Sequence, residues 1–253
     1  NDKWRFISKS GTTIATKDVL SLTIKIFKQK KISKLLRDFI FITEDKNNYM
    51  RIFAKKNNIL CFDHDPNIGG RFSIFSITSL LPLISIGYSL PKIIKSFIEA
   101  KKLFEKNHRD LSKYTSYSIA YEKKFDLNIL VGLSYHDKIN AVNEWYRQIF
   151  AESLGKNKNA KNYISSYGSI DQHSQFQLYI DGPYDKHFNF FKIKNNNKAV
   201  NSNASLIKGY NLMSTLENGA IKTLQQKKFL VTQISIDDDF NSYCYLLFYL
   251  IFD

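Results

Sequence analysis

Short apolar runs alternate with helix-like segments over the first 62 residues, and this alternation is the feature that most limits the fold of the chain. Runs of strand-like composition lie at 4–7, 38–43 and 59–62. The segments between them, at 16–36 and 48–57, have the spacing of amphipathic helices. Because parallel strands need a crossover connection, usually a helix, the pattern predicts a parallel sheet covered by helices.

The same alternation returns after residues 107–118, a polar segment without Pro or Gly that we expect to bridge two lobes. A strand is predicted at 125–133, and a basic loop at 157–162. An apolar-periodic run follows at 176–180. Strands are predicted at 188–193 and 229–236, a helix at 206–224, and a buried helix or strand at 241–252. The predicted fold class is therefore α/β with two lobes, 1–106 and 107–253, each a mainly parallel sheet flanked by helices.

The chain is strongly basic but lacks the motifs of a nucleic-acid-binding protein. Lys and Arg total 37 against 23 Asp and Glu, which gives a formal charge of +14. The lysines are scattered, and no Cys/His zinc pattern, basic zipper or aromatic RNA-binding motif occurs. We expect no nucleic-acid partner, although salt-dependent binding is kept as a distant alternative, and infer a mild attraction for anionic substrates such as sugar phosphates.

Membrane insertion and disulfide formation are both disfavoured by the sequence. The apolar run 74–90 falls short of the roughly 18–20 residues of a span and contains Pro82, and the run 243–252 is shorter still. No signal peptide is expected at the N-terminus. Cys61 and Cys244 lie in apolar runs and are predicted as buried thiols, which fits a reducing cytoplasm.

A hydroxyl-rich turn, Ser-Lys-Ser-Gly-Thr-Thr at 8–13, follows the first predicted strand and precedes a helix. In this geometry backbone N–H groups and hydroxyls converge on a phosphate at the positive end of a helix. A turn of this kind can also do no more than cap its helix, and the residues alone leave that alternative open.

A second candidate motif is Gly69-Gly70-Arg71. Two glycines let the backbone approach a ligand, and the arginine after them offers a planar cationic group. The alternative is a plain loop with an exposed Arg. Because two glycines before an arginine and an aromatic residue are uncommon, we favour a function here.

The helix-like stretch 144–156 carries the candidate catalytic group. Helical spacing places Glu144, Gln148 and Glu152 on one face, and Gly155 is a predicted C-cap. A carboxylate held at such a helix end beside a cleft could move a proton between carbon atoms of a substrate. The alternative is an ordinary solvated helix face.

These motifs together resemble the glucose-6-phosphate isomerase family. The resemblance rests on 8–13, 69–71, 152–156 and 168–175, which occur in the family's order along nearly all of the chain. It implies two doubly wound sugar-isomerase (SIS) lobes and the interconversion of glucose 6-phosphate and fructose 6-phosphate through a cis-enediol. It also implies a cytoplasmic homodimer with a shared active site and no cofactor or metal.

Each motif residue has a role that the resemblance implies. Glu152 would carry the proton between C1 and C2, and Gln148 would orient the substrate. Arg71 would stabilise the enediolate oxygens, and His173 would help to open the sugar ring from the partner subunit. The residues expected to hold the substrate and its phosphate are Ser8, Lys9, Ser10, Thr13 and Gly70. The resemblance places the carboxylate, the guanidinium and the hydroxyl turn around one small anionic ligand.

The chain departs from the family pattern at three places. Ala15 stands where the family usually has Glu. The family's Gly-rich segment before the first strand and its lysine-bearing C-terminal helix are not found within 1–253. The chain is therefore expected to be truncated at both ends relative to the family, and the alternative function is a non-catalytic or decayed phosphosugar-binding fragment. A bifunctional phosphoglucose/phosphomannose isomerase matches the motifs less well.

Overall fold

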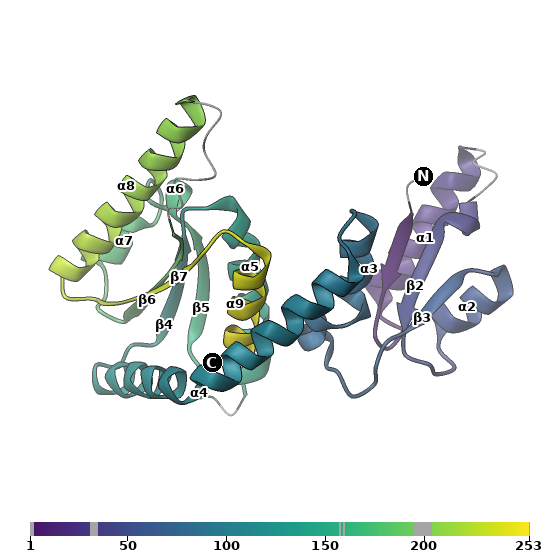
Figure 1. Ribbon diagram of the computed structural model, residues 1–253, viewed down its shortest axis with the longest axis horizontal. Helices are drawn as coiled ribbons and strands as arrows, with labels where there is room; N and C mark the ends of the chain where they lie inside the picture. Colours follow the sequence, from purple (N-terminus) through teal and green to yellow (C-terminus); the bar gives the residue numbers. More distant parts are fainter. Residues whose placement is uncertain (1–2, 31–34, 157, 159, 195–203, 253) are drawn as a thin grey trace. The chain divides into compact units, whose positions relative to one another are not determined.

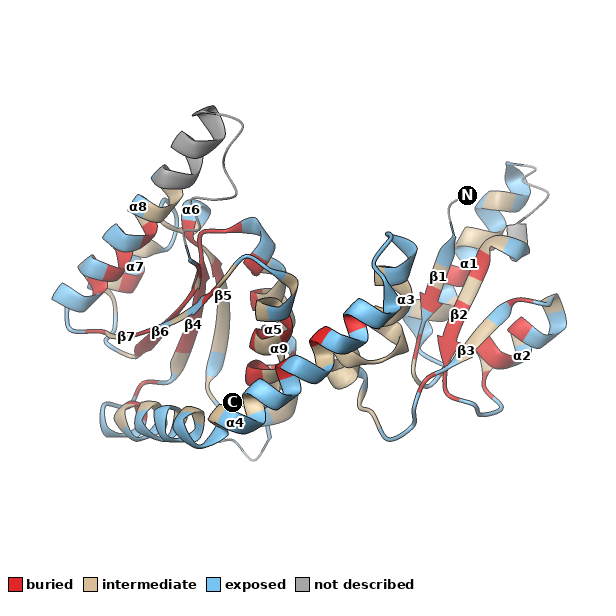
Figure 2. Ribbon diagram, in the orientation of Figure 1, coloured by how far each residue is buried: buried red, intermediate tan, exposed pale blue. Residues whose placement is uncertain are grey.

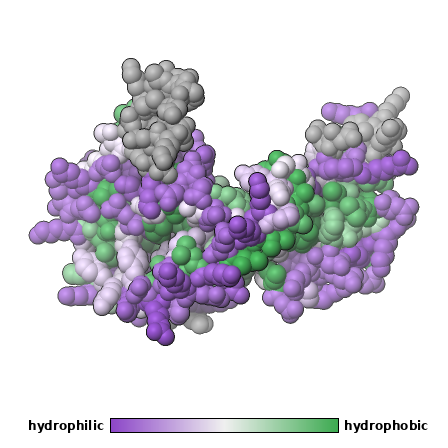
Figure 3. Space-filling view, in the orientation of Figure 1, coloured by the Kyte–Doolittle hydropathy of each residue, from purple (hydrophilic) through white to green (hydrophobic). Residues whose placement is uncertain are grey.

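The structure is a computed structural model, which describes residues 3–30, 35–156, 158, 160–194 and 204–252. The chain divides into two compact units, Asn1–Ile94 and Lys95–Asp253. Figure 1 shows a sheet with flanking helices in each unit. Hydrophilic side chains cover much of the outer surface of both (Figure 3), as expected for helices that pack one face on a sheet.

The first unit is built on a three-stranded parallel sheet of order β1-β2-β3. Its strands are β1 (Trp4–Ile7), β2 (Phe39–Thr43) and β3 (Leu60–Asp63). Its helices are α1 (Ile14–Gln29), α2 (Tyr49–Asn57) and α3 (Ile77–Ser85), with 3-10 turns η1 (Leu35–Asp38) and η2 (Gly70–Phe75). Phe6, Phe41, Leu20 and Met50 form part of one buried cluster, so the strands and helices that the apolar runs predict share a core (Figure 2).

The second unit is built on a four-stranded parallel sheet of order β5-β4-β6-β7. Its strands are β4 (Ile129–Ser134), β5 (Asn162–Tyr167), β6 (Lys186–Ile193) and β7 (Leu230–Ile236). Its helices are α5 (Asp137–Leu154), α6 (Gly168–Asp171), α7 (Phe176–Asp181), α8 (Ala204–Gln226) and α9 (Phe240–Phe252), together with most of α4 (Leu90–Lys124).

Central strand β6 explains why helices cover both faces of this sheet. Successive side chains of a strand point to opposite faces, so Phe190 and Phe191 enter different cores. Phe190 packs in a cluster with Tyr179 of α7 and Leu224 of α8, whereas Phe191 packs with residues of α5 and α9 such as Leu246. The α/β fold class predicted from the sequence is thereby confirmed.

The polar segment 107–118 is not a bridge between lobes but lies inside helix α4, and the contacts divide the chain after Ile94 instead of after residue 106. Every third or fourth side chain of α4 is buried or half-buried, at Ile93, Ser96, Ala100, Phe104, Asn107, Leu111, Thr115, Ser118 and Glu122. Several of these inward positions are polar, and they hide the apolar periodicity that normally identifies an amphipathic helix.

Two further expectations concern cysteines and membrane spans. Neither Cys61 nor Cys244 forms a disulfide in the described part of the chain, and burial raises the pKa of both thiols, that of Cys244 to about 12. Cys244 is buried, as predicted, whereas Cys61 is only half-buried and packs against the core of its unit. Within the described ranges, none of the helices combines the length and apolar character that a bilayer span requires.

Candidate functional site

The hydroxyl turn 8–13 lies at the carboxyl edge of the first sheet, between the end of β1 and the start of α1. Ser8 Oγ lies 3.0 Å from Thr13 Oγ1, and the backbone N–H and the hydroxyl of Thr12 both donate to Ser10 Oγ. Among the described residues, Thr13 caps no backbone N–H of α1 with its side chain. The hydroxyls therefore lie at the N-terminus of α1, whose first N–H groups have no cap from Thr13. The helix dipole is positive there and stabilises an anion.

Gly11 fixes the shape of this turn. Its φ is +63°, and an added Cβ would lie 2.1 Å from Asn48 Oδ1. Asn48 in turn caps α2 and donates from Nδ2 to Thr43 Oγ1 at 3.1 Å. Thr43 Oγ1 donates to Lys9 O at 3.1 Å. The turn is thus attached to the carboxyl end of β2 and the start of α2, and only glycine fits at its centre.

Lys9 connects the hydroxyl turn to the segment that leads into the second motif. Its ammonium donates to Pro66 O at 2.8 Å and Ile68 O at 2.9 Å, and it lies 3.6 Å from the carboxylate of Glu44. The hydroxyl turn is therefore held next to the segment that precedes Gly69-Gly70-Arg71, within the first unit. A contact of Lys9 with a phosphate stays a prediction.

Gly70 and Arg71 open the 3-10 turn η2, which begins directly after Gly69. An added Cβ at Gly70 would meet no described atom within 4 Å, so open space lies beside this backbone. Arg71 is half-buried, and its guanidinium carbon lies 4.9 Å from the centroid of the Phe72 ring. A cation–π contact of this kind restricts the guanidinium without neutralising its charge.

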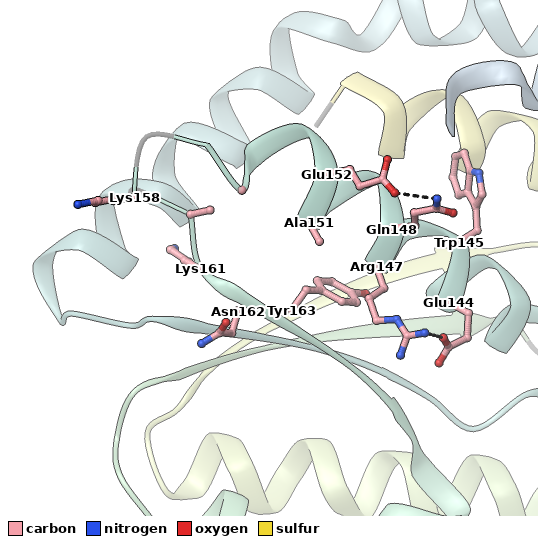
Figure 4. Close-up of a pocket in the computed structure, with 12 residues that line it drawn as sticks. Glu144, Trp145, Arg147, Gln148, Ala151, Glu152, Lys158, Lys161, Asn162 and Tyr163 are labelled. Carbon is pink, nitrogen blue, oxygen red and sulfur yellow. Dashed lines mark hydrogen bonds and ion pairs between the residues drawn. The ribbon is translucent and has the colours of Figure 1, made fainter. Parts of the chain in front are cut away.

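Glu152 lies in the last turn of α5, as its sequence context predicts. Gln148 Nε2 donates to Glu152 Oε1 at 2.9 Å (Figure 4), which is the contact expected of residues one helical turn apart. Gly155 is the C-cap, and its N–H donates to Ala151 O. Glu152 is exposed, so its carboxylate can be reached from solvent.

A hollow of about 1000 Å³ lies beside Glu152, between the last turns of α5 and the beginning of β5. Arg147, Lys158 and Lys161 line it together with the carboxylates of Glu144 and Glu152, and Tyr163 contributes an aromatic wall (Figure 4). Arg147 is paired with Glu144, and Lys161 is paired with Glu122. Three cations against two carboxylates leave a small positive excess in the lining, which suits a polar anionic ligand that must also give up a proton. Lys158 and Lys161 belong to the predicted basic loop 157–162, whose charge is the sequence signal for this part of the lining.

His173 lies at the opposite edge of the sheet from Glu152. Strand β5 starts at Asn162, which lines the hollow, and ends at Tyr167, from which the chain passes through α6 to His173. Six residues of strand span roughly 20 Å at about 3.3 Å per residue. Within the second unit of a single chain, Glu152 and the exposed His173 are therefore separated by about the length of a strand.

The segment that carries His173 is held by specific contacts. Asp171 Oδ2 accepts hydrogen bonds from Ser166 Oγ at 2.6 Å and from the N–H of Tyr167 at 2.7 Å. The hydroxyl of Tyr135 donates to Gln172 Oε1 at 3.2 Å. These bonds hold the segment that directly precedes His173. In the part of the chain that the structure describes, no cluster of three or more His, Cys, Asp or Glu side chains is placed to hold a metal ion.

No family model matches the chain, but related proteins are found by sequence. The glucose-6-phosphate isomerase of Campylobacter jejuni is 36% identical over 197 residues, covering 76% of this chain and 48% of that protein. That of Methanocaldococcus jannaschii is 35% identical over 193 residues, covering 74% and 46%. The probable glucose-6-phosphate isomerase of Methanococcus maripaludis is 31% identical over 231 residues, covering 88% and 51%. The chain thus spans about half the length of these curated relatives.

Similar folds occur among solved structures. A hypothetical protein of Thermus thermophilus superposes with a TM-score of 0.80 at 22% identity, covering 99% of this chain and 64% of that one. A glucose-6-phosphate isomerase of Chlamydia trachomatis gives 0.74 at 16%, covering 98% and 52%. The tagatose-6-phosphate ketose/aldose isomerase of Escherichia coli gives 0.58 at 12%, covering 98% and 65%.

The two parallel sheets with helices on their faces place the chain in the class of sugar-isomerase-type α/β folds. Within that class, it is a homologue of the glucose-6-phosphate isomerases, at 24–36% identity to the curated relatives. The resemblance predicted from the sequence motifs is thereby confirmed.

Proposed function

We propose that this chain carries catalytic residues of an aldose–ketose isomerase that interconverts glucose 6-phosphate and fructose 6-phosphate. The observation that carries the proposal is the position of Glu152, an accessible carboxylate bonded to Gln148 in a hollow that three basic residues help to line. The homology to glucose-6-phosphate isomerases supports the same reaction. Because the chain spans about half of those relatives, the activity of the whole protein is part of the proposal.

The hydroxyl turn would hold the phosphate of the substrate. Ser8, Ser10 and Thr13 present hydroxyls at the start of α1, and the helix dipole adds positive potential there. Hydroxyl and backbone N–H donors suit the oxygens of a phosphate monoester. The phosphate would position the sugar without taking part in the chemistry.

Glu152 would move the proton. In fructose 6-phosphate its carboxylate takes a proton from C1, the C1–H electron pair forms the C1–C2 double bond, and the C2 carbonyl oxygen gains negative charge. Transfer of the C1 hydroxyl proton to the C2 oxygen gives the isomeric cis-enediolate, and Glu152 returns its proton to C2 as the C1 carbonyl forms. The products are an aldehyde at C1 and a hydroxyl at C2, so no redox partner is needed. Gln148 would orient the carboxylate through its 2.9 Å bond.

Arg71 and His173 would assist at other stages. The enediolate carries a developing oxyanion, and the Arg71 guanidinium would stabilise it without taking a proton. The imidazole of His173 would transfer a proton to the ring oxygen when the sugar opens. Because His173 lies a strand length away from Glu152 of its own second unit, we assign this step to the partner subunit of a homodimer.

The proposal is tested by a coupled assay of the full chain with fructose 6-phosphate. We expect Glu152→Gln to lower kcat by about 10²–10⁴-fold, because the amide cannot accept the proton. Glu144→Gln is the matched control on the same helix face and is expected to retain most activity. Turnover that Glu152→Gln leaves unchanged would refute the assignment. Wild-type phosphosugar binding without turnover would instead support the alternative of a non-catalytic phosphosugar-binding chain.

A further inference from the structure

The second unit contains a partly open cavity of about 340 Å³ that the proposed isomerase reaction does not use. It lies between α4, α5 and α9 and one face of the sheet. Most of its lining is apolar or aromatic, including Ile119, Leu130, Tyr146, Phe150, Leu154 and Tyr249. Its volume lies at the lower end of the roughly 300–1,000 Å³ that small-molecule pockets occupy.

One end of the cavity carries a chain of buried polar groups. His187 Nδ1 lies 2.7 Å from Glu122 Oε1, and His187 Nε2 lies 2.9 Å from Thr232 Oγ1. Thr232 Oγ1 also donates to Asn189 Oδ1 at 3.1 Å. All four residues are at most 8% exposed. Polar groups are costly to bury in an apolar wall unless each has a hydrogen-bond partner. A chain of polar groups that bond one another avoids this cost and is rigid.

The charges around this polar end leave an excess of cation. Lys161 is paired with Glu122, and Lys123 also lines the cavity. Burial acts to raise the pKa of Glu122, but the hydrogen bonds and charges of His187 and Lys161 outweigh it and lower the pKa. Glu122 is therefore an anion at neutral pH, and the two lysines outnumber this one carboxylate.

We propose that this cavity binds a small organic monoanion, with its apolar body against the aromatic lining and its anionic group near Lys161 and Lys123. The apolar lining supplies the favourable burial, and the placed polar groups select the charge and the orientation of the ligand. Ala160 and Lys161 border both this cavity and the hollow beside Glu152. The two sites are nonetheless distinct, because their remaining lining residues differ.

The test uses 2-naphthoate as the probe, with titration calorimetry for affinity and ¹H–¹⁵N spectra of the histidine rings for position. Ser118→Trp and Ile119→Trp place a large side chain at the α4 wall of the cavity, where Ser118 is half-buried and Ile119 is exposed. Ser116→Trp on the exposed face of the same helix is the matched control. Naphthalene-2-methanol, which is neutral and of similar size, tests the role of charge.

We expect 2-naphthoate to bind one-to-one with a dissociation constant below about 1 mM and to shift the His187 ring signals. Either blocking variant should weaken binding at least ~10-fold, whereas Ser116→Trp should bind as the wild type does. The neutral alcohol should bind several-fold more weakly than the acid. Absence of binding, wild-type affinity in both blocking variants, unmoved His187 signals, or equal affinity for the alcohol would overturn the proposal.

Discussion

Glu217 is a buried carboxyl group on α8 with little compensation for its charge. It is 2% exposed, and Lys192 Nζ lies 3.7 Å from its Oε2. Its Oε1 has no hydrogen-bond partner among the described residues. Burial raises the pKa of this carboxyl to about 7, although the lysine acts in the opposite direction. The folded protein therefore holds a proton that the unfolded chain releases.

This proton makes stability depend on pH. Because the folded-state pKa is raised from 4.5 to about 7, the free energy of unfolding should fall as pH rises through that interval and level off above it. From about pH 5 to about pH 8, the free energy of unfolding measured with urea should fall by up to about 3 kcal/mol more in the wild type than in Glu217→Gln. Parallel pH profiles for the two proteins would contradict the raised pKa.

Gly132 is a residue of β4 whose missing side chain makes room for α5. An added Cβ would lie 2.0 Å from Tyr163 Oη and 2.3 Å from Asn143 Oδ1. Asn143 also donates to Gly132 O at 2.8 Å, so the helix is bonded to the strand at this point. The close approach of helix and strand therefore depends on glycine at this position.

Replacing Gly132 by Ala should lower the free energy of unfolding by about 2–3 kcal/mol, because Asn143 and Tyr163 must move out of a bonded arrangement. Gly219→Ala is the control, since its Cβ would meet no described atom within 4 Å in the interior of α8. That change should be neutral or stabilise by up to about 1 kcal/mol. Equal effects of both substitutions on chemical denaturation would refute the steric argument.

Among the elements, α4 differs most from its predicted form, because residues 107–118 continue the helix instead of linking two lobes. A proline in a helix interior removes a hydrogen bond and clashes with the preceding turn, whereas a linker tolerates it. Ser112→Pro should therefore cost about 3 kcal/mol or more of stability and reduce helical circular dichroism, relative to Ser112→Ala. A proline variant as stable as the alanine variant would indicate a linker.

The strands predicted best from the sequence are those with continuous apolar runs. Strands β1 to β3 and β6 to β7 all lie where their apolar runs predict them, within a few residues. Strand β5, Asn-Tyr-Ile-Ser-Ser-Tyr, is not predicted from the sequence, which places residue 162 at the end of a loop. It is an edge strand paired only with β4 and contains two serines, so its local composition does not favour a buried strand.

The site was predictable to the extent that it depends on local spacing. The bond between Gln148 and Glu152 follows from helical periodicity, and the position of the hydroxyl turn follows from the strand before it. The contribution of Lys158 and Lys161 to the hollow depends on where the end of α5 meets the start of β5. Such contacts come from the path of the chain, which local propensity does not encode.

At the scale of the whole molecule, the proposed reaction needs two copies of the chain. A parallel βαβ unit returns its helix to the amino edge, which places Glu152 there, whereas His173 follows the carboxyl end of β5. If a homodimer supplies His173 from its partner, a mixed dimer of two defective chains contains one intact site and one doubly defective site.

Mixing Glu152→Gln with His173→Ala should therefore restore activity after subunit exchange. Random exchange would recover about a quarter of the wild-type activity, because about half of the dimers are mixed and each has one intact site of two. The double variant Glu152→Gln/His173→Ala mixed with itself is the control. If the activity of the mixture does not exceed the sum of the activities of the two separate variants, a shared site is contradicted. A monomeric mass for the active protein would contradict it as well.

Incorporation of solvent deuterium tests the central claim most directly, since that claim is proton transfer by Glu152 between C1 and C2. Fructose 6-phosphate is converted in D₂O, and the glucose 6-phosphate formed is analysed by proton NMR at C2. We predict deuterium at C2 with the wild type, because the exposed carboxyl exchanges with solvent, and a loss of this labelling by at least ~100-fold with Glu152→Gln. Labelling by Glu152→Gln at the wild-type rate would contradict it.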